Sequence, residues 1–296
     1  MILGAGIAFL CALAWAGSST ILKLLTARID TLSINTLRLW VGSLLILGFV
    51  FFSGRGPELM GLELGPLVYV ISSGILAMAF GDSIYIKSLS LLDASIAFPL
   101  AQCSFPLMAV VAAVIFLDES FTWLNAIGAV LVVGGVYLIV VLGQTKNAEG
   151  QKKGISRQGV ILAFVSALAW TGSTVLLKIG TIGMDPFVAA GSRILASAIT
   201  LSGLVIFKKQ GISNLARFDL KSIILAASAG ILTYGVAAVG YVAAIQMIGA
   251  GKTVLLTTTA PLFVLPFSIL ILNEKPTFYT ITGIFLCVCG ICLVVN

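Results

Sequence analysis

The sequence predicts an all-α integral membrane protein with ten transmembrane helices, arranged as two inverted five-helix repeats. Of its 296 residues, 59% are hydrophobic and only 9% are charged, whereas a soluble globular domain carries about 25% charged residues. The second observation is a series of long apolar stretches, and the third is that the first half of the chain recurs in the second half. These stretches leave no room for a separate soluble domain.

The apolar stretches give ten predicted spans, each close to the ~20 residues that a bilayer core requires. We expect helices, because a helix satisfies its own backbone polar groups in lipid and the alternation of barrel strands is missing. The predicted spans are residues 2–25, 34–52, 66–86, 92–117, 122–143, 159–180, 187–207, 221–245, 250–272 and 277–295. The first run lacks a preceding basic segment and recurs in mid-chain, so we expect a span rather than a cleaved signal peptide.

The two halves are related by a constant shift along the sequence. Residues 8–18 recur as residues 163–173, an offset of 155. A polar connection separates the halves, so we place a first repeat at residues 1–143, a linker at 144–158 and a second repeat at 159–296. Because each half holds an odd number of spans, the second copy must enter the membrane upside down. Inverted repeats of this kind are typical of transporters that alternate their access.

Lys and Arg residues are distributed unevenly between the two sides of the predicted bundle. The connections after the odd-numbered spans carry eleven of them, while the side with both termini carries only Arg55 and Lys252. The positive-inside rule therefore predicts that both termini lie outside the cytoplasm. It also explains the formal net charge of +6 without a nucleic-acid partner, since no basic soluble surface is expected.

The composition argues against metal-dependent and ATP-driven chemistry. The chain has no histidine, and its five cysteines lie in apolar spans, where thiols act as small hydrophobic groups. No glycine-rich phosphate-binding loop followed by Lys-Ser or Lys-Thr occurs. We therefore expect no cofactor. A polytopic lipid-modifying enzyme is a distant alternative, because it would need convergent His, Asp or Glu residues.

Several features recur in both halves in the same order. The first span contains a tryptophan followed by Gly-Ser, the second an arginine near its start, and the fourth a proline and a terminal acidic corner. The residues that carry these features are Trp15 and Trp170, Arg38 and Arg193, Pro106 and Pro261, and Glu119 and Glu274. Glycine-rich fifth spans follow. Over essentially its whole length, the chain resembles two repeats of the EamA-type permeases of the drug/metabolite transporter superfamily.

This resemblance implies ten helices around a central cavity between the halves. It also implies the export or import of metabolites or amphipathic compounds across the cell membrane. Members of the family often have both termini in the cytoplasm, which is opposite to the result of the charge count. The orientation is therefore open at this point, and so is the choice between a monomer and a homodimer.

Asp82 is the most unusual residue of the chain, because a carboxylate inside a span is costly and should face the bundle interior or water. Tyr85 lies three residues later, so both side chains can face one cavity. With a slip of one residue, the second half keeps the tyrosine as Tyr241 but has Ala238 in place of Asp82. We expect Asp82 to accept a proton or to bind a cationic substrate group. The alternative is a structural ion pair with Lys87.

Other polar and aromatic residues within the spans are candidates to line the substrate path, although polar residues also join membrane helices to one another. The candidates are Trp15, Ser18, Ser19, Gln102, Ser104, Trp170, Ser173, Thr257 and Thr258. Pro106 and Pro261 are predicted inside helices, where proline removes a backbone donor and kinks the helix. Matching interruptions in two halves point to a hinge at the binding site, and the alternative is a kink that only shapes packing.

Basic residues near helix ends are candidates for gates, with acidic residues as their partners. Inversion places one member of each equivalent pair at each face, which suits ion pairs that form alternately. The candidates are Lys23, Arg38, Lys178, Arg193, Glu119 and Glu274. The alternative is that these long basic side chains simply extend to water at the interface.

Glycines recur seven residues apart in the fifth span of each half, at Gly128 and Gly135 and at Gly283 and Gly290. Seven residues are close to two helical turns, so each pair lies on one stripe. Small residues let membrane helices approach closely. We expect these stripes to pack against one another, either between the halves or between protomers.

The sequence therefore predicts a secondary transporter in the lipid bilayer. It would move a small metabolite, an amino acid or an amphipathic compound by rocking of the two halves, with or without coupling to protons. A sugar-phosphate or nucleotide-sugar antiporter is a weaker alternative, because such anions require several Lys or Arg residues at mid-membrane.

Overall fold

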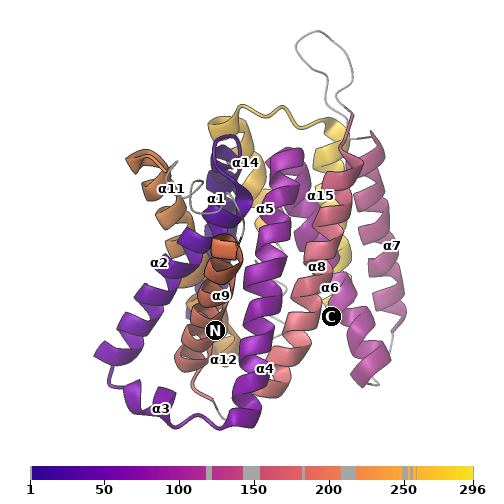
Figure 1. Ribbon diagram of the computed structural model, residues 1–296. Coiled ribbons are helices and arrows are strands. Elements are labelled where there is room, and N and C mark those ends of the chain that lie inside the picture. The colour runs from indigo at the N-terminus through magenta and orange to yellow at the C-terminus, as the bar shows by residue number, and fades with distance from the viewer. Residues whose placement is uncertain are drawn as a thin grey trace.

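The computed structural model describes residues 2–117, 122–142, 154–181, 184–207, 218–248 and 259–295, together with residues 253, 256 and 257. All described elements are helices, and helices from the two halves of the sequence pack against each other in one bundle (Figure 1). Within the part of the chain that the structure describes, seven helical runs are long and apolar enough to cross a membrane. The predicted fourth, ninth and tenth spans correspond to apolar helices that are shorter over the described residues.

The first half of the chain begins with two long helices, followed by a short connecting helix and a third long run that is built from three elements. The bounds are α1 (Ile2–Leu25), α2 (Thr31–Phe52), α3 (Gly56–Met60), α4 (Leu64–Gly74), η1 (Ile75–Gly81), α5 (Asp82–Leu91), α6 (Ala94–Leu117), α7 (Trp123–Tyr137) and η2 (Leu138–Leu142). Over the described residues, the second half repeats the two long first helices and the three-element third run in this order. Its elements are α8 (Arg157–Gly180), α9 (Pro186–Phe207), α11 (Leu220–Gly230), η3 (Ile231–Ala238), α12 (Val239–Ile248), α14 (Ala260–Leu272) and α15 (Phe278–Val295).

The third long run of each half contains a π-helix, η1 in the first and η3 in the second. With the one-residue slip noted above, the two π-helices occupy equivalent positions. The predicted third and eighth spans, residues 66–86 and 221–245, show no sign of this interruption in their apolar pattern. A π-helix is rare and is frequently found at functional sites. Its presence in both halves makes it a feature of the shared scaffold.

Aspartates fix the beginnings of three helices. Asp30 precedes α2 and Asp185 precedes α9, and each accepts hydrogen bonds from two backbone N–H groups of the first helical turn. Asp219 caps α11 in the same manner, and its hydrogen bonds with Ser222 lower its pKa from the usual range. A capping side chain satisfies donors that have no partner inside the helix. The equivalent caps of α2 and α9 are part of the repeat.

The outer surface of the bundle is apolar, which suits the hydrocarbon of a bilayer. Phe52 is 95% exposed, Phe207 89% and Leu270 78%. In contrast, many of the fully buried residues are small or polar, such as Ser73 and Thr20. This inversion of the pattern of a soluble protein places the polar side chains where helices meet, as expected for a membrane protein.

The glycine stripes pack the last helices of the two halves together. A Cβ atom at Gly135 would lie 2.5 Å from the carbonyl oxygen of Gly283, and one at Gly290 would lie 2.6 Å from that of Gly128. The backbones of α7 and α15 are therefore in contact, and the two helices lie side by side in Figure 1. The predicted packing role is confirmed, and the contact is between the two halves of the chain.

The two predicted hinge prolines are not equivalent in the structure. Pro106 lies within α6, which continues through it and through Pro99. Pro261 lies instead in the first turn of α14, two residues after the N-cap Thr259. At that position the missing N–H group has no partner in a helix anyway, so proline begins the helix instead of bending it. The prediction of two matching prolines inside helices was therefore wrong for Pro261.

Candidate functional site

Asp82 is the first residue of α5 and lies directly after the π-helix η1. The wider turn of η1 leaves the carbonyl oxygen of Met78 to accept a hydrogen bond of 2.7 Å from the amide of Asn35 on α2. This bond ties the π-helix to the neighbouring helix one turn before Asp82. The backbone just before the carboxylate is thus fixed to α2.

Asp82 binds side chains from three other elements. The indole Nε1 of Trp170 on α8 donates to Oδ1 at 3.0 Å, and the hydroxyl of Tyr234 on η3 donates to Oδ2 at 2.7 Å. Nη1 of Arg38 on α2 lies 4.0 Å from Oδ2. Trp170 and Tyr234 belong to the second half of the chain, so the carboxylate joins the two halves. Hydrogen bonds to an ionised group are stronger than those between neutral groups.

Arg38 is buried in this cluster, with only 2% of its surface exposed. Its guanidinium donates to Oδ1 of Asn35 at 3.1 Å and to the hydroxyl of Thr233 at 3.0 Å, and lies 5.2 Å from the centre of the Tyr234 ring. The alternative that Arg38 extends to interfacial water is wrong, because its charge is held inside the bundle. The ion pair of Asp82 with Lys87 is replaced by the contact with Arg38.

Arg193 occupies the place in the second half that Arg38 occupies in the first. Its Nη2 donates to the hydroxyl of Ser173 at 3.2 Å, and that hydroxyl donates to the carbonyl of Ser73 at 2.7 Å. In the other half, Ser18 donates to the carbonyl of Ala229 at 3.1 Å and shares a hydrogen bond of 2.7 Å with Thr233, which binds Arg38. The two arginines are therefore held by equivalent hydrogen-bond chains across the repeats.

Two glycines allow a helical run of each repeat to pack closely against a helix of the other repeat. A Cβ atom at Gly74 would lie 2.6 Å from the carbonyl oxygen of Arg193, and one at Gly230 would lie 2.8 Å from that of Arg38. Any side chain at these positions would push the helices apart. The third helical run of each repeat thus rests directly on the arginine-bearing helix of the other repeat.

Two aromatic pairs also follow the repeat. The rings of Tyr85 and Trp170 are 5.5 Å apart, and those of Trp15 and Tyr241 are 5.6 Å apart, with similar tilts of 54° and 51°. The Tyr85 hydroxyl shares a hydrogen bond of 2.5 Å with Ser19. The structure thus brings together most of the predicted path residues near Asp82, although an apolar pair of this kind is equally able to fill a core.

Some predicted path residues lie apart from this cluster. Gln102 is half-buried and Ser104 is buried on α6, and among the described residues neither makes a hydrogen bond to the Asp82 cluster. Thr257 is buried. Thr258 lies outside the described residues.

The gate candidates Lys23 and Glu274 meet at the corner between α5 and α6. The ammonium group of Lys23 donates to the carbonyl oxygens of Leu89 and Leu92, at the end of α5. The carboxylate of Glu274 accepts from the backbone N–H groups that begin α6. Each charge matches the partial charge of the helix end that it contacts. The equivalent side chains of Lys178 and Glu119 lie outside the described residues.

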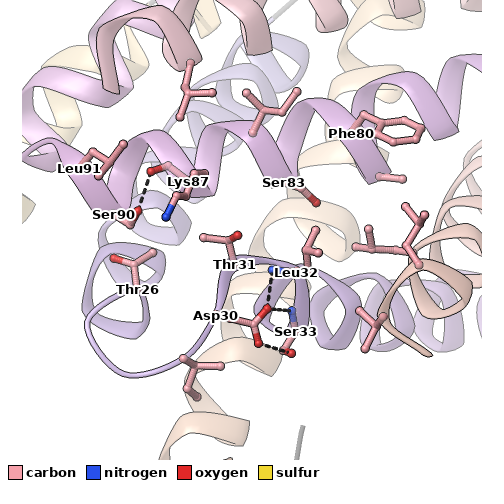
Figure 2. Close-up of a pocket in the computed structure, with 17 residues that line it drawn as sticks. Thr26, Asp30, Thr31, Leu32, Ser33, Phe80, Ser83, Lys87, Ser90 and Leu91 are labelled. Atoms are coloured by element: carbon pink, nitrogen blue, oxygen red, sulfur yellow. Dashed lines mark hydrogen bonds between the residues drawn. The ribbon is translucent and has the colours of Figure 1, made fainter. Parts of the chain in front are cut away.

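A cavity of about 990 Å³ opens beside this cluster, between the beginning of α2, the end of α5 and the end of α9. Figure 2 shows Asp30, Lys87 and Ser83 among its polar lining residues. Ser83 Oγ accepts from the amide of Asn35 at 2.9 Å, and Asn35 in turn accepts from Arg38. A chain of hydrogen bonds therefore runs from the cavity wall to the central charges.

The sequence analysis did not single out Tyr234, Asn35 or Thr233. Tyr234 aligns with Met78 and Thr233 with Ala77, so each is a further position where the two repeats differ. A systematic comparison of the repeats at these positions would have found them. Their convergence on Asp82 depends on the packing between repeats, which no local pattern reveals.

Comparison with known proteins agrees with this arrangement of two repeats. The profile of the EamA-like transporter family matches residues 2–141 and 157–296. An uncharacterized transporter of Archaeoglobus fulgidus is 26% identical over 233 residues, which cover 78% of this chain and 77% of that protein. The uncharacterized transporter YoaV of Bacillus subtilis is 32% identical over 139 residues, 45% of this chain and 43% of the relative.

One solved crystal structure shares the fold, with a TM-score of 0.69 over 99% of this chain and 96% of the other. The sequence identity is 19%, so this likeness concerns the fold alone. The family profile covers nearly the whole chain in two copies, and the bundle has several helices able to cross a membrane. The chain therefore belongs to the EamA-like transporter family and is a multi-pass protein of the cell membrane.

Proposed function

We propose that this protein is a secondary transporter in which ten spans form two inverted repeats and the repeats rock about a central site. The observation that carries the proposal is the pair of hydrogen bonds that Asp82 of the first repeat accepts from Trp170 and Tyr234 of the second. An ionisable group thus links the two repeats at their centre. A change of its charge would alter their contact.

Asp82 is the proposed proton-binding residue. The charged and titratable groups that face it are Arg38 from α2, Arg193 from α9 and Tyr234 from η3, with Tyr85 on its own helix. A proton on Asp82 would cancel its attraction to the arginines and weaken the bonds from the second repeat. Proton binding and movement of the repeats would therefore be coupled, as linkage requires.

The corner between α5 and α6 is the proposed gate at one face. Lys23 and Glu274 bind opposite sides of this corner, and Glu274 follows α14 of the other repeat. Opening this face would require both contacts to break. By the symmetry of the repeats, Lys178 and Glu119 would form the gate at the other face. The cavity of Figure 2 lies near the first gate and is the proposed route of access.

The purified protein in proteoliposomes tests both transport and coupling. An imposed pH gradient should drive uptake of a labelled compound from a panel of amino acids and organic acids, and an internal pH dye should report proton entry. In Asp82→Asn, exchange without a gradient should continue, while gradient-driven accumulation should be lost. An unchanged response to pH in this variant would remove Asp82 from the mechanism, and a covalently altered product without flux would indicate an enzyme.

The orientation of the chain needs a separate measurement. The uneven distribution of Lys and Arg supports termini outside the cytoplasm. A fluorescent reporter that folds only in the cytoplasm, fused after Asn296, should remain dark if this orientation holds. Fluorescence of the fusion would reverse the assignment of the two faces.

A further inference from the structure

We propose that the transported molecule carries a single carboxylate, which binds Arg193 at the centre of the bundle, and that the rest of the molecule is apolar or aromatic. The inference rests on the proposed function, since it takes the cluster around Asp82 as the transport site. It replaces the expectation that Asp82 binds a cationic substrate group.

The central cluster holds two arginines and one carboxylate. An arginine stays protonated in proteins, so Arg38 and Arg193 contribute two permanent positive charges against the one negative charge of Asp82. Arg38 lies 4.0 Å from Asp82, and the described residues offer no ion pair for Arg193. One positive charge is therefore left over inside the membrane, where an uncompensated charge is costly.

Arg193 is also incompletely hydrogen-bonded. It donates through Nη2 to Ser173 at 3.2 Å, while its Nε is buried without a hydrogen-bond partner among the described residues. Buried donors are nearly always satisfied, so an exception needs an explanation. The planar guanidinium matches a carboxylate, which can bind two of its N–H groups at once. A carboxylate ligand would satisfy both the charge and the free donor.

The acid of the cluster is already engaged, which argues against a cationic ligand. Both oxygens of Asp82 accept hydrogen bonds from the second repeat, and Arg38 lies beside them. A cation would have to displace these partners and would add to the positive excess. A doubly charged phosphate would in turn leave a negative excess, so the charge balance favours a single carboxylate.

The surroundings of the charges favour an apolar or aromatic body. Trp170, which binds Asp82, packs against Tyr85 with tilted rings, and Trp15 and Tyr241 form the equivalent pair, also with one ring from each repeat. All four side chains belong to helices that reach the centre. Aromatic faces bind apolar and aromatic groups through large contact areas and specific ring geometry.

The charge balance also predicts how a proton and the carboxylate influence each other. A proton on Asp82 raises the central charge from one to two positive, which attracts an anion more strongly. Coupling between two ligands is reciprocal, so the bound anion would equally favour the proton. Among the described residues, the groups that face Asp82, namely Arg38, Arg193, Tyr234 and Tyr85, include no second acid.

Binding of four probes to the purified full-length protein in nanodiscs tests the proposal. The probes share a phenyl group and differ in charge: hydrocinnamate is an anion, its amide is neutral, phenylpropylamine is a cation and phenylalanine is a zwitterion. Calorimetry and thermal stabilisation should show binding of hydrocinnamate and at least ~10-fold weaker binding of the amide, the amine and the zwitterion. Preference for the amine or the zwitterion, or no binding of hydrocinnamate, would overturn the proposal.

Variants assign the binding to Arg193. Arg193→Gln keeps a donor for Ser173 but removes the charge, and it should weaken carboxylate binding by roughly 10- to 100-fold. Arg193→Lys should retain a measurable part of the affinity, and Arg157→Gln, at an exposed arginine that begins α8, should bind as the unmodified protein does. Asp82→Asn should bind hydrocinnamate more tightly. Equal losses in the Arg193 and Arg157 variants would also overturn the assignment.

The outcome is independent of the transport test. If hydrocinnamate binds through Arg193 but no flux is found in proteoliposomes, the charge inference stands and the proposed function fails. If flux is found but is carried by cationic compounds, the proposed function stands and the charge inference fails. The two results therefore distinguish the two proposals.

Discussion

The centre of the bundle contains two sets of equivalent positions that share their framework but differ in chemistry. Arg38 and Arg193 are equivalent, and so are the glycines on which their backbones rest. Asp82, however, aligns with Ala238, and Tyr234 aligns with Met78. The shared positions bring the helices of the two repeats into contact, while the differing ones determine charge and hydrogen bonding. The positions that are equivalent in the two repeats therefore form the framework that moves. The positions that differ determine what the site recognises.

Moving the acid from one repeat to the other tests this comparison most strongly. Asp82→Ala removes the partner of a buried arginine, which should lower the free energy of unfolding by about 3 kcal/mol. Combining it with Ala238→Asp places a carboxylate at the equivalent position beside Arg193 and should recover part of the loss. Melting temperatures of both variants provide the measurement, and a double variant that melts below the single one would contradict the equivalence.

The glycine contacts are the next target, because they let the third helical run of each repeat pack on the arginine-bearing helix of the other repeat. Gly74→Ala or Gly230→Ala should destabilise the protein by about 1–3 kcal/mol through overpacking and should abolish transport. Gly48→Ala and Gly203→Ala are matched controls, since a Cβ atom at either position meets nothing within 4 Å. The controls should be neutral or more stable by up to about 1 kcal/mol, because alanine favours a helix. Similar melting temperatures in both groups would show that the close glycine contacts do not determine stability.

The two equivalent tryptophans, Trp15 and Trp170, should differ in how much they contribute to stability and to pH-dependent uptake. Trp170→Phe keeps a ring beside Tyr85 but removes the hydrogen bond to Asp82, with an expected loss of about 1.5 kcal/mol. Trp15 faces the repeat that lacks the acid, so Trp15→Phe should lower the free energy of unfolding by less. Melting temperatures and pH-dependent uptake measure the difference, and equal effects of the two variants would mean that the indole bond contributes little.

The smallest effect is expected at the corner between α5 and α6. Glu274→Gln keeps an acceptor but removes a negative charge from the N-terminus of α6, which should cost about 0.3–1 kcal/mol. Its transport rate should change more than its stability, because the contact must break when this face opens. Glu63→Gln is the control, since Glu63 begins α4 without a side-chain capping bond. Unchanged transport in Glu274→Gln would count against the gate.

The sequence predicts the helical class and the repeat because the bilayer permits few alternatives. Apolar length determines the spans, and over the described residues seven of the predicted ones are helices of sufficient length. The candidate site was harder to predict from the sequence, and Arg38 shows why. The predicted span began at residue 34, whereas α2 begins at Thr31, so Arg38 lies about one turn deeper than expected. It was assigned to a gate, although its charge belongs to the centre.

Asp82 and Trp170 were found because a carboxylate and a tryptophan inside apolar spans are unusual in themselves. Tyr234 and Asn35 are not unusual, and their roles come from contacts between helices far apart in the sequence. The partners of Lys23 and Glu274 are backbone atoms, which carry no residue identity for a sequence to display. Such contacts require the three-dimensional arrangement.

The π-helices also determine which residues of the third helical run can change independently. The wider turn of each π-helix changes the angle around the helix axis between the glycine before the turn and the residue after it. Gly74 and Gly230 are constrained by a neighbouring backbone, whereas the residues after η1 and η3 are Asp82 and Val239, with Ala238 ending η3. The side chain beyond the wide turn can therefore vary without disturbing the contact before it. In such a scaffold, substrate preference can diverge by single substitutions while the helix crossing is preserved.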